Sequence, residues 1–277
     1  MKERKNIIFP KLIFINDNGN KFLEENWIRF LFSEIGEKDI FFLTPNCIKD
    51  FLVKLNKLDF PIFIFSENSK LSKEKIYLLK KFNFKYGLIH LSDEWFVANY
   101  AKLYNGASFV LRNYVNKSLL NIPYIFHIPI GYKIRNLQKE SKSINKKQDK
   151  IFFKGAMKGE RIKMLNEFKK NGLEVTSGSN ERLNYSEYLV QLKNYKYGLS
   201  PYGNTTPDTL RIYEYLENGV LPILGSRQSF DYFILLFEES PPFLYGKSWK
   251  QVSRKFILKK YIAKQNSNLK IIKWWER

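Results

Sequence analysis

Cysteine and histidine are scarce in this chain of 277 residues, and their scarcity excludes two kinds of site. The single cysteine, Cys47, cannot form an intramolecular disulfide, and the two histidines, His90 and His127, cannot complete a Cys/His metal cluster. We therefore expect no structural zinc and no bound metal, and we assign structural roles to Cys47 and His127.

Long apolar runs are also missing. No uninterrupted run approaches the ~18 to 20 residues that a membrane-spanning helix needs, and Lys11 interrupts the apolar residues near the N-terminus. Hydrophobic residues nevertheless make up 44% of the chain, which is enough for a substantial core. The sequence predicts a soluble cytoplasmic protein without a signal peptide, with peripheral attachment at the inner face of the membrane left open.

Acidic residues are few relative to basic ones, with 27 Asp and Glu against 47 Lys and Arg and a formal net charge of +20. Such a charge is typical of proteins that bind nucleic acid or an anionic membrane. The lysines, however, are spread over every predicted element, and the abundance of Lys, Asn, Ile and Phe is typical of AT-rich coding sequence. We interpret the charge as a diffuse solvated surface that can attract a polyanionic substrate or inner-leaflet lipid, and we expect no specific nucleic acid partner.

Short β-branched and aromatic runs alternate with longer amphipathic segments along the chain. Strands are predicted at residues 11–15, 39–43, 61–65, 86–91, 108–112, 124–128, 150–154, 172–176, 197–200 and 220–224. Helices are predicted between several of them, at residues 20–35, 46–55, 70–82 (with Ser72 as N-cap), 159–171 and 185–194. This alternation implies βαβ units and mainly parallel sheets.

The most polar segment of the chain, residues 135–150, lacks apolar periodicity and is interpreted as a linker. The predicted fold class is therefore α/β, with two Rossmann-like βαβ domains facing across a cleft. We place them at residues 1–140 and 148–265, with residues 266–277 as a C-terminal segment packing back on the body. Trp274 and Trp275 stand beside basic residues in that segment, so a membrane-surface anchor is the alternative.

The stretch LSPYGNTTPDTLRIYEYLENG, from Leu199 to Gly219, joins a strand to a helix through a glycine-containing loop. Thr206 is the predicted N-cap of a helix from Pro207 to Asn218, and Gly219 follows it as a C-cap signal. The backbone N–H groups of such a loop and the positive end of the helix dipole favour an anion such as a diphosphate. In open α/β sheets, ligands bind at this carboxyl edge of the strands.

Three charged residues follow that loop at intervals of three. Arg211 can bind a phosphate, Glu214 can accept hydrogen bonds from ribose hydroxyls, and Asp208 is expected to support the helix N-terminus. The alternative is that they form intrahelical ion pairs on a solvated face. Neither GxGxxG nor GxxxxGK[ST] occurs, which argues against a dinucleotide fingerprint and a P-loop.

An ordered set of short motifs resembles the C-terminal half of the exostosin-like glycosyltransferases. The matching residues are Phe153 and Gly155, Arg161, Tyr185 and Leu189, Pro201 and Gly203, Arg211 and Glu214, and Gly219 and Pro222. The segments GLIHLSDEW from Gly87 and VLRNY from Val110 look closest to the ribitol xylosyltransferase branch. The resemblance covers roughly residues 87–224, and the first 80 residues match only as a generic βα pattern.

This resemblance implies a GT-B fold, with an acceptor-side domain at residues 1–140 and a nucleotide-sugar-binding domain at residues 148–265. It implies an inverting transferase that moves a sugar from a nucleotide-diphosphate donor to a glycan or lipid-linked glycan, in cell-surface polysaccharide or lipopolysaccharide synthesis. No D-x-D occurs in the chain, which fits a metal-independent enzyme. No cofactor is expected, and a UDP-sugar is the preferred co-substrate.

The resemblance also implies site residues. The donor-binding set is Gly155, Arg161, Pro201, Tyr202, Gly203, Thr205, Thr206, Asp208, Arg211 and Glu214. The catalytic base is sought across the cleft, in the order Asp93, Glu94 and His90, although Asp93 and Glu94 could instead begin a helix. Arg112 is assigned to the acceptor or a phosphate, with a structural ion pair as the alternative, and Tyr202 could pack in the core instead of stacking on the donor.

Two other functions remain open at this point. One is a basic nucleic-acid-binding protein that uses the charge of +20. The other is a non-catalytic relative that keeps the sugar-nucleotide pocket as a binding module.

Overall fold

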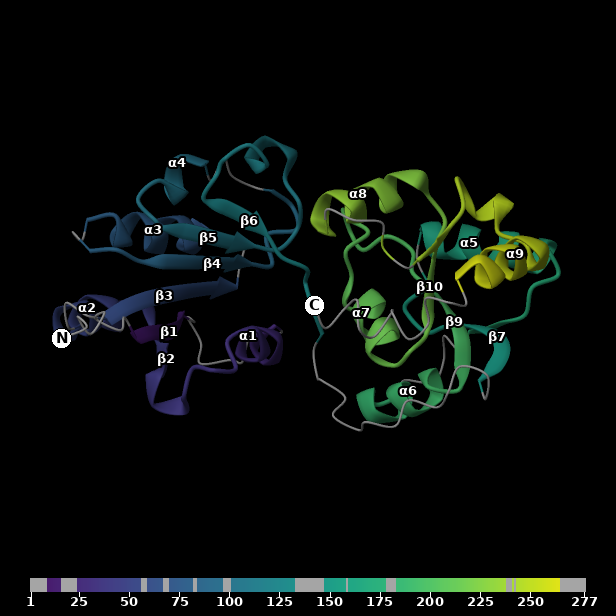
Figure 1. Ribbon diagram of the computed structural model, residues 1–277, viewed down its shortest axis with the longest axis horizontal. Coiled ribbons are helices and arrows are strands. Elements are labelled where there is room, and N and C mark those ends of the chain that lie inside the picture. Colours follow the sequence, from purple (N-terminus) through teal and green to yellow (C-terminus); the bar gives the residue numbers. More distant parts are fainter. Residues whose placement is uncertain are drawn as a thin grey trace, which may run out of the picture. The chain divides into compact units, whose positions relative to one another are not determined.

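The computed structural model describes residues 9–15, 24–55, 59–66, 70–81, 84–96, 101–132, 147–157, 159–177, 183–237, 241 and 243–264. Its contacts divide the chain into two compact units, Met1–Lys133 and Ile134–Arg277, and Figure 1 labels the elements of each. The sequence places the domains at residues 1–140 and 148–265. The C-terminal segment, residues 266–277, lies outside the described residues, as do Trp274 and Trp275.

The first unit is built on a six-stranded sheet in which every pair of neighbours is parallel. Its strands are β1 (Phe9–Ile15), β2 (Ile40–Leu43), β3 (Asp59–Ser66), β4 (Gly87–Leu91), β5 (Phe109–Arg112) and β6 (Ile125–His127), in the order β2-β1-β3-β4-β5-β6. Its helices are α1 (Glu25–Leu31), α2 (Ile48–Lys54), α3 (Lys70–Leu79) and α4 (Ala101–Tyr104), with 3₁₀ turns at Glu37–Asp39, Pro45–Cys47 and Lys117–Leu119. The strand after β1 is added on one side of the β1–β3 pair, and the strand after β3 is added on the other side. The switch point of this sheet therefore lies between β1 and β3.

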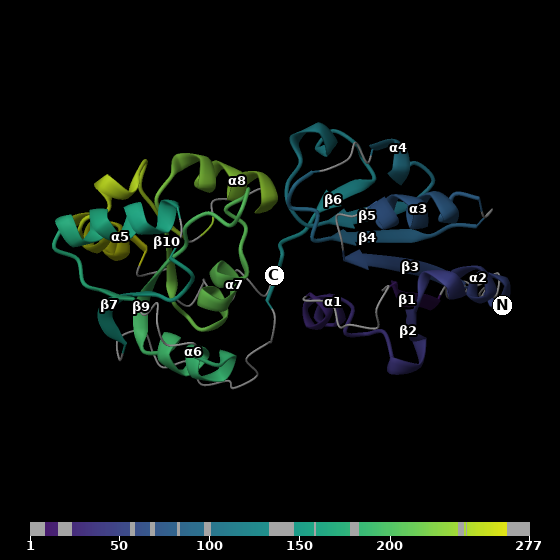
Figure 2. The same cartoon turned by 180° about the vertical axis from the view of Figure 1, so that it is seen from behind.

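The second unit repeats this arrangement with five parallel strands. The strands are β7 (Gln148–Phe153), β8 (Val175–Ser177), β9 (Tyr195–Leu199), β10 (Leu221–Leu224) and β11 (Leu244–Tyr245), in the order β11-β10-β9-β7-β8. The helices are α5 (Glu160–Lys170), α6 (Tyr185–Leu192), α7 (Leu210–Glu217), α8 (Arg227–Phe237) and α9 (Arg254–Lys264), with a 3₁₀ turn at Trp249–Gln251. Figures 1 and 2 show α5 and α9 together on one side of the strands, with α6 and α7 on the other. The switch point of this sheet lies between β7 and β9.

Burial of the central strands on both faces explains why they form. Residues 61–65 of β3 and all of β4 and β10 are buried, as expected for parallel strands covered by helices on both sides. The expected α/β class with parallel sheets is confirmed, and each predicted strand is present within a few residues of its expected position.

Some local predictions are wrong. Helix α3 begins at Lys70, so Ser72 lies inside the helix instead of capping it. Strand β11 and helices α8 and α9 come after the last predicted strand and were not foreseen from the sequence.

Candidate functional site

The carboxyl edge of the second sheet brings Gly155 and Arg211 together. Gly155 follows β7, and a Cβ atom placed on it would lie 2.7 Å from Nη2 of Arg211. That same nitrogen donates a hydrogen bond to the carbonyl of Lys154 at 3.3 Å, and the guanidinium lies 5.1 Å from the ring centroid of Phe153. The guanidinium therefore packs directly on the backbone at the end of β7, and a side chain at position 155 would displace it.

A second guanidinium joins this edge from the first turn of α5. Arg161 donates from Nη1 to the carbonyl of Ala156 at 3.0 Å. Its pKa is lowered by burial and by the positive charge of Arg211, and Glu160 offsets part of this effect. Among the described residues, neither Arg161 nor Arg211 forms an ion pair with a carboxylate. A bound anion would relieve the repulsion between these two cations, so this part of the carboxyl edge is our candidate for an anion site.

The loop after β9 contributes a turn and a buried hydroxyl. The N–H of Gly203 donates to the carbonyl of Thr206 at 2.7 Å, which folds the loop back on itself. Pro201 is buried, Tyr202 and Gly203 are half-buried, and Thr205 is exposed. Thr206 is buried, and within the described part of the chain its Oγ1 has no hydrogen-bond partner. A buried hydroxyl without a partner is unusual in a folded protein, so Thr206 is a candidate for contact with a ligand.

Thr206 is not the N-cap of α7, and the predicted start at Pro207 is wrong. The helix begins at Leu210, after Thr209 in an extended conformation, and Thr209 makes no side-chain capping bond. Asp208 lies in the loop before this start, and its carboxylate accepts hydrogen bonds from the hydroxyls of Tyr213 and Tyr232. The acidic residue thus connects the loop to α7 and α8 through these two tyrosines.

Glu214 lies in α7 with a side chain that is only 8% exposed. The Tyr185 hydroxyl donates to its Oε1 at 3.0 Å, and the Tyr188 hydroxyl donates to its Oε2 at 2.9 Å. The alternative interpretation, ion pairs on a solvated face, does not describe this carboxylate. Each oxygen keeps a further lone pair, so ribose hydroxyls can still bind. Burial, together with nearby Tyr215 and Glu214, raises the pKa of Tyr188, so it stays a neutral donor.

In the first unit, three of the predicted site residues share one buried network. Nη2 of Arg112 lies 3.2 Å from Oδ2 of Asp93, with side chains 0% and 1% exposed. Nη1 of Arg112 donates to the Tyr104 hydroxyl at 3.2 Å, and that hydroxyl lies 2.6 Å from Nδ1 of His90. Arg112 thus takes the structural ion pair that the sequence left as its alternative, and this arrangement closes Asp93 and His90 off from solvent.

Glu94 follows this network in a turn and is half-buried. It is the accessible member of the three predicted base candidates. Trp95, next to it, is 56% exposed.

His127 lies at the end of β6, near the same network. Its Nε2 accepts a hydrogen bond from the Asn116 N–H at 3.1 Å. Burial and the charge of Arg112 lower its pKa from 6.5 to about 4. His127 is therefore a neutral hydrogen-bond acceptor at neutral pH.

The sequence did not predict a second set of polar residues at the carboxyl edge of this sheet: Glu24, Ser66, Ser92 and Asn113. Ser66 Oγ lies 3.1 Å from Glu24 Oε2, and Ser92 Oγ lies 2.6 Å from Glu24 Oε1. The Ser92 N–H donates to Asn113 Oδ1 at 2.9 Å. Ser66 ends β3 and Ser92 directly follows β4. Polar residues at the carboxyl ends of predicted strands are a signal that could have identified both serines. Glu24 has no such signal, because only the packing of α1 brings it there.

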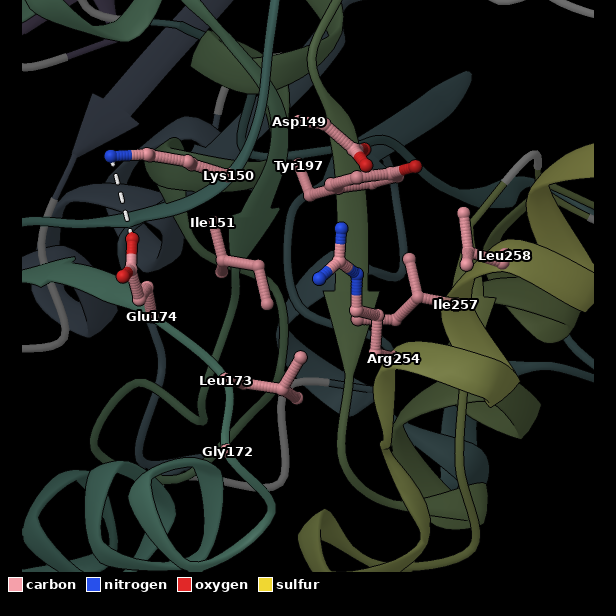
Figure 3. Close-up of a pocket in the computed structure, with 10 residues that line it drawn as sticks. All are labelled: Asp149, Lys150, Ile151, Gly172, Leu173, Glu174, Tyr197, Arg254, Ile257 and Leu258. Atoms are coloured by element: carbon pink, nitrogen blue, oxygen red, sulfur yellow. Dashed lines mark ion pairs between the residues drawn. The ribbon is translucent and has the colours of Figure 1, made fainter.

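A cavity of about 270 Å³ lies elsewhere in the second unit (Figure 3). Its lining comes from the start of β7, from the turn before β8, from β9 and from α9, where Arg254 extends into it. Lys150 and Glu174 form an ion pair at 3.4 Å on its rim. The cavity is on the amino half of β7, away from Gly155 and the carboxyl edge, and it includes none of the predicted site residues.

Within the described part of the chain, no group of three or more His, Cys, Asp and Glu side chains could hold a metal ion. No helix in that part is long and apolar enough to cross a membrane. No protein-family model matches this chain, and no curated protein is significantly similar to it.

Proposed function

We propose that this protein is an inverting, metal-independent glycosyltransferase of the GT-B type, related to the exostosin-like enzymes. It transfers a sugar from a nucleotide-diphosphate donor, a UDP-sugar in the first instance, to a glycan acceptor. It acts in cytoplasmic synthesis of a cell-surface polysaccharide or lipopolysaccharide. The observation that carries the proposal is the pair Arg161 and Arg211 at the β7–β9 switch point, without carboxylate partners among the described residues.

The donor site follows from these contacts. Arg161 and Arg211 bind the diphosphate, and Thr206, in the loop after β9, adds a hydroxyl that has no partner among the described residues. Glu214, held by Tyr185 and Tyr188, accepts hydrogen bonds from the ribose. As the acceptor hydroxyl attacks the anomeric carbon, the bond to the diphosphate breaks, and the two guanidinium groups stabilise the departing negative charge.

The acceptor hydroxyl must lose its proton in this displacement. Glu94 is our choice of general base, because Asp93 and His90 are engaged in the buried Arg112 network. Replacing Glu94 by Gln is expected to leave donor binding intact and to reduce transfer by 10²-fold or more, roughly the contribution of a general base. Loss of donor binding in this variant would contradict the assignment.

The test of the proposal is thermal unfolding with UDP, GDP and CMP. A nucleotide at 100 times its dissociation constant adds about 2.7 kcal/mol to the free energy of unfolding, which raises the melting temperature by roughly 5 °C or more. We expect Arg211→Ala to lose this shift and Arg227→Ala, an exposed arginine on α8, to keep it. Absence of any shift in the wild type would refute the donor site.

A nucleic-acid-binding protein is the second candidate, favoured by the formal charge of +20. Its affinity for duplex DNA would fall steeply with salt, with a log–log slope of about −0.9 for each phosphate contacted. Tight, salt-dependent binding of DNA, with no change of melting temperature on adding nucleotide, would favour the nucleic-acid-binding function. Nucleotide binding without transfer to any acceptor would instead indicate a non-catalytic relative.

A further inference from the structure

The switch point of the first sheet carries a row of polar side chains that the mechanism above does not use. This row, Glu24, Ser66, Ser92 and Asn113, is called the Glu24 row below. Ser66 ends β3, Ser92 follows β4 and Asn113 follows β5, so three neighbouring strands present them at one edge. Glu24 precedes α1, the helix that follows β1. Ligands of doubly wound sheets bind at this position.

The hydrogen bonds of Glu24 determine which way the two serine hydroxyls point. The Glu24 side chain is 0% exposed, and within the described residues its carboxylate oxygens are bonded only by Ser66 and Ser92. Both serine hydroxyls donate to this carboxylate, Ser66 to Oε2 and Ser92 to Oε1. The Ser66 hydroxyl also lies within hydrogen-bonding distance of Ser92 Oγ, at 3.3 Å, and both half-buried oxygens still have a lone pair for a ligand.

Asn113 adds a hydrogen-bond donor to the same row. It is 0% exposed, and its Oδ1 accepts from the Ser92 N–H. Its Nδ2 has no hydrogen-bond partner within the described residues. A buried amide N–H without a partner is costly, because it has given up water without a replacement. A ligand that accepts this hydrogen bond would remove the cost.

Backbone strain is concentrated at the same place. Ser92 has φ of 63°, and Phe96, four residues later, has φ of 51°. Residues other than glycine rarely adopt this conformation, and it persists where a site requires a side chain in an unfavourable position. Glycine at position 92 would be free of this strain but would lack the hydroxyl.

We propose that the Glu24 row binds the hydroxyl groups of the sugar acceptor. A sugar hydroxyl both donates and accepts, which matches two serine oxygens that accept and one amide that donates. Glu24 is a positioning residue, since it acts through the orientation of Ser66 and Ser92. This inference rests on the proposed transferase function, because it assigns the acceptor side of that reaction.

Ligand-observed NMR with the full chain tests the proposal. The probes are the methyl glycosides of glucose, galactose, mannose and N-acetylglucosamine, and we expect saturation transfer to at least one of them. Ser92→Ala should weaken its binding roughly 3- to 10-fold, the loss of one hydrogen bond. Ser33→Ala, an exposed serine after the last turn of α1, is the matched control and should bind as the wild type does.

Glu24→Gln separates binding from folding. The glutamine amide donates to one serine and so turns that hydroxyl's proton outward, with almost no change in shape. We expect glycoside binding to fall by a similar factor while the melting temperature holds or rises, since a buried charge has been removed. A drop in melting temperature with unchanged glycoside binding would show that Glu24 has a structural role, and would overturn the proposal.

The nucleotide melting shift, measured on the same samples, separates the two proposals. Suppose that nucleotide raises the melting temperature as expected, but the wild type binds no glycoside or all variants bind it equally. The acceptor role of the Glu24 row is then refuted, and the proposed donor site is unaffected. If the wild type binds a glycoside and the variants do not, but no nucleotide changes the melting temperature, the Glu24 row is still a sugar site and the transferase proposal is refuted.

Discussion

At the scale of single residues, the proposed donor site depends on close packing between Arg211 and the backbone. Gly155 is the clearest case, because Nη2 of Arg211 occupies the space that a Cβ would need. The guanidinium is fixed between the Lys154 carbonyl and the Phe153 ring, and so it is preorganised for an anion.

Replacing Gly155 by Ala should therefore displace Arg211 more than it disturbs the fold. We expect nucleotide affinity to fall about 10-fold or more, the loss of one charge-assisted contact, with a small change in melting temperature. Isothermal titration calorimetry with UDP measures this. Gly36→Ala is the control, since the nearest atom there is 4.0 Å from the added Cβ. Unchanged affinity in Gly155→Ala would remove Arg211 from the diphosphate site.

The lowered pKa of a single residue, His127, predicts that the stability of the protein depends on pH. Its pKa is about 4 in the folded chain and 6.5 as the ordinary value, so the unfolded chain binds the proton more readily. The stabilisation is complete above pH 6.5 and is lost as pH falls to about 4. Because the ring is partly exposed, we expect about 2 kcal/mol, less than the full linkage value of about 3 kcal/mol.

Urea unfolding at a series of pH values measures this effect. His127→Gln keeps an acceptor for the Asn116 N–H but does not titrate. The free energy of unfolding of the variant should fall less between pH 6.5 and 4 than that of the wild type. Parallel curves would show that His127 contributes nothing to the acid sensitivity.

At the scale of elements, the position of α7 decides where Arg211 and Glu214 lie. The helix is held against β9 by Tyr215, which is fully buried and donates its hydroxyl to the Leu199 carbonyl at 3.0 Å. Its ring carbon would lie 2.4 Å from a Cβ on Gly198. The two elements therefore approach so closely because the strand has a glycine where the ring packs.

Gly198→Ala should push α7 away from β9. We expect a loss of about 1–3 kcal/mol in the free energy of unfolding, the usual cost of overpacking, together with weaker nucleotide binding. A double-mutant cycle with Tyr215→Ala checks the cause, because the alanine at 198 should cost less once the ring is gone. Additive costs would mean that Tyr215 is not what restricts position 198.

At the scale of the whole molecule, the five strands of the second sheet follow the same order as the first five strands of the first sheet, and each sheet has polar residues at its switch point. The second unit offers cations, and the first offers a carboxylate that orients hydroxyls. This division of charge fits a donor with a diphosphate in one unit and a neutral polyol in the other.

Hydrogen exchange of the full chain with and without UDP tests this division. We expect added protection at residues 153–161 and 199–214, which carry the donor contacts, and little change at the carboxyl edge of the first sheet. Protection centred on residues 24, 66 and 92 would place the nucleotide in the wrong unit and reverse our assignment.

The sequence by itself determined the class of fold and the location of most strands, because buried parallel strands are short apolar runs separated by amphipathic helices. It also brought Gly155, Arg211 and the loop after β9 to one edge, since the carboxyl ends of parallel strands meet there. The sequence also predicts the position of residues that are close together in the chain, such as those around Pro201 and Gly203.

Only the tertiary structure decided the partners of each charge. Asp93 and Arg112 are 19 residues apart, and Ser92 and Glu24 are 68 residues apart, so no local pattern shows that they meet. Asp208 accepts hydrogen bonds from two tyrosines that lie on different helices, α7 and α8. The physical reason is that a buried polar group must take the partner that the packing brings to it, and that partner belongs to another element.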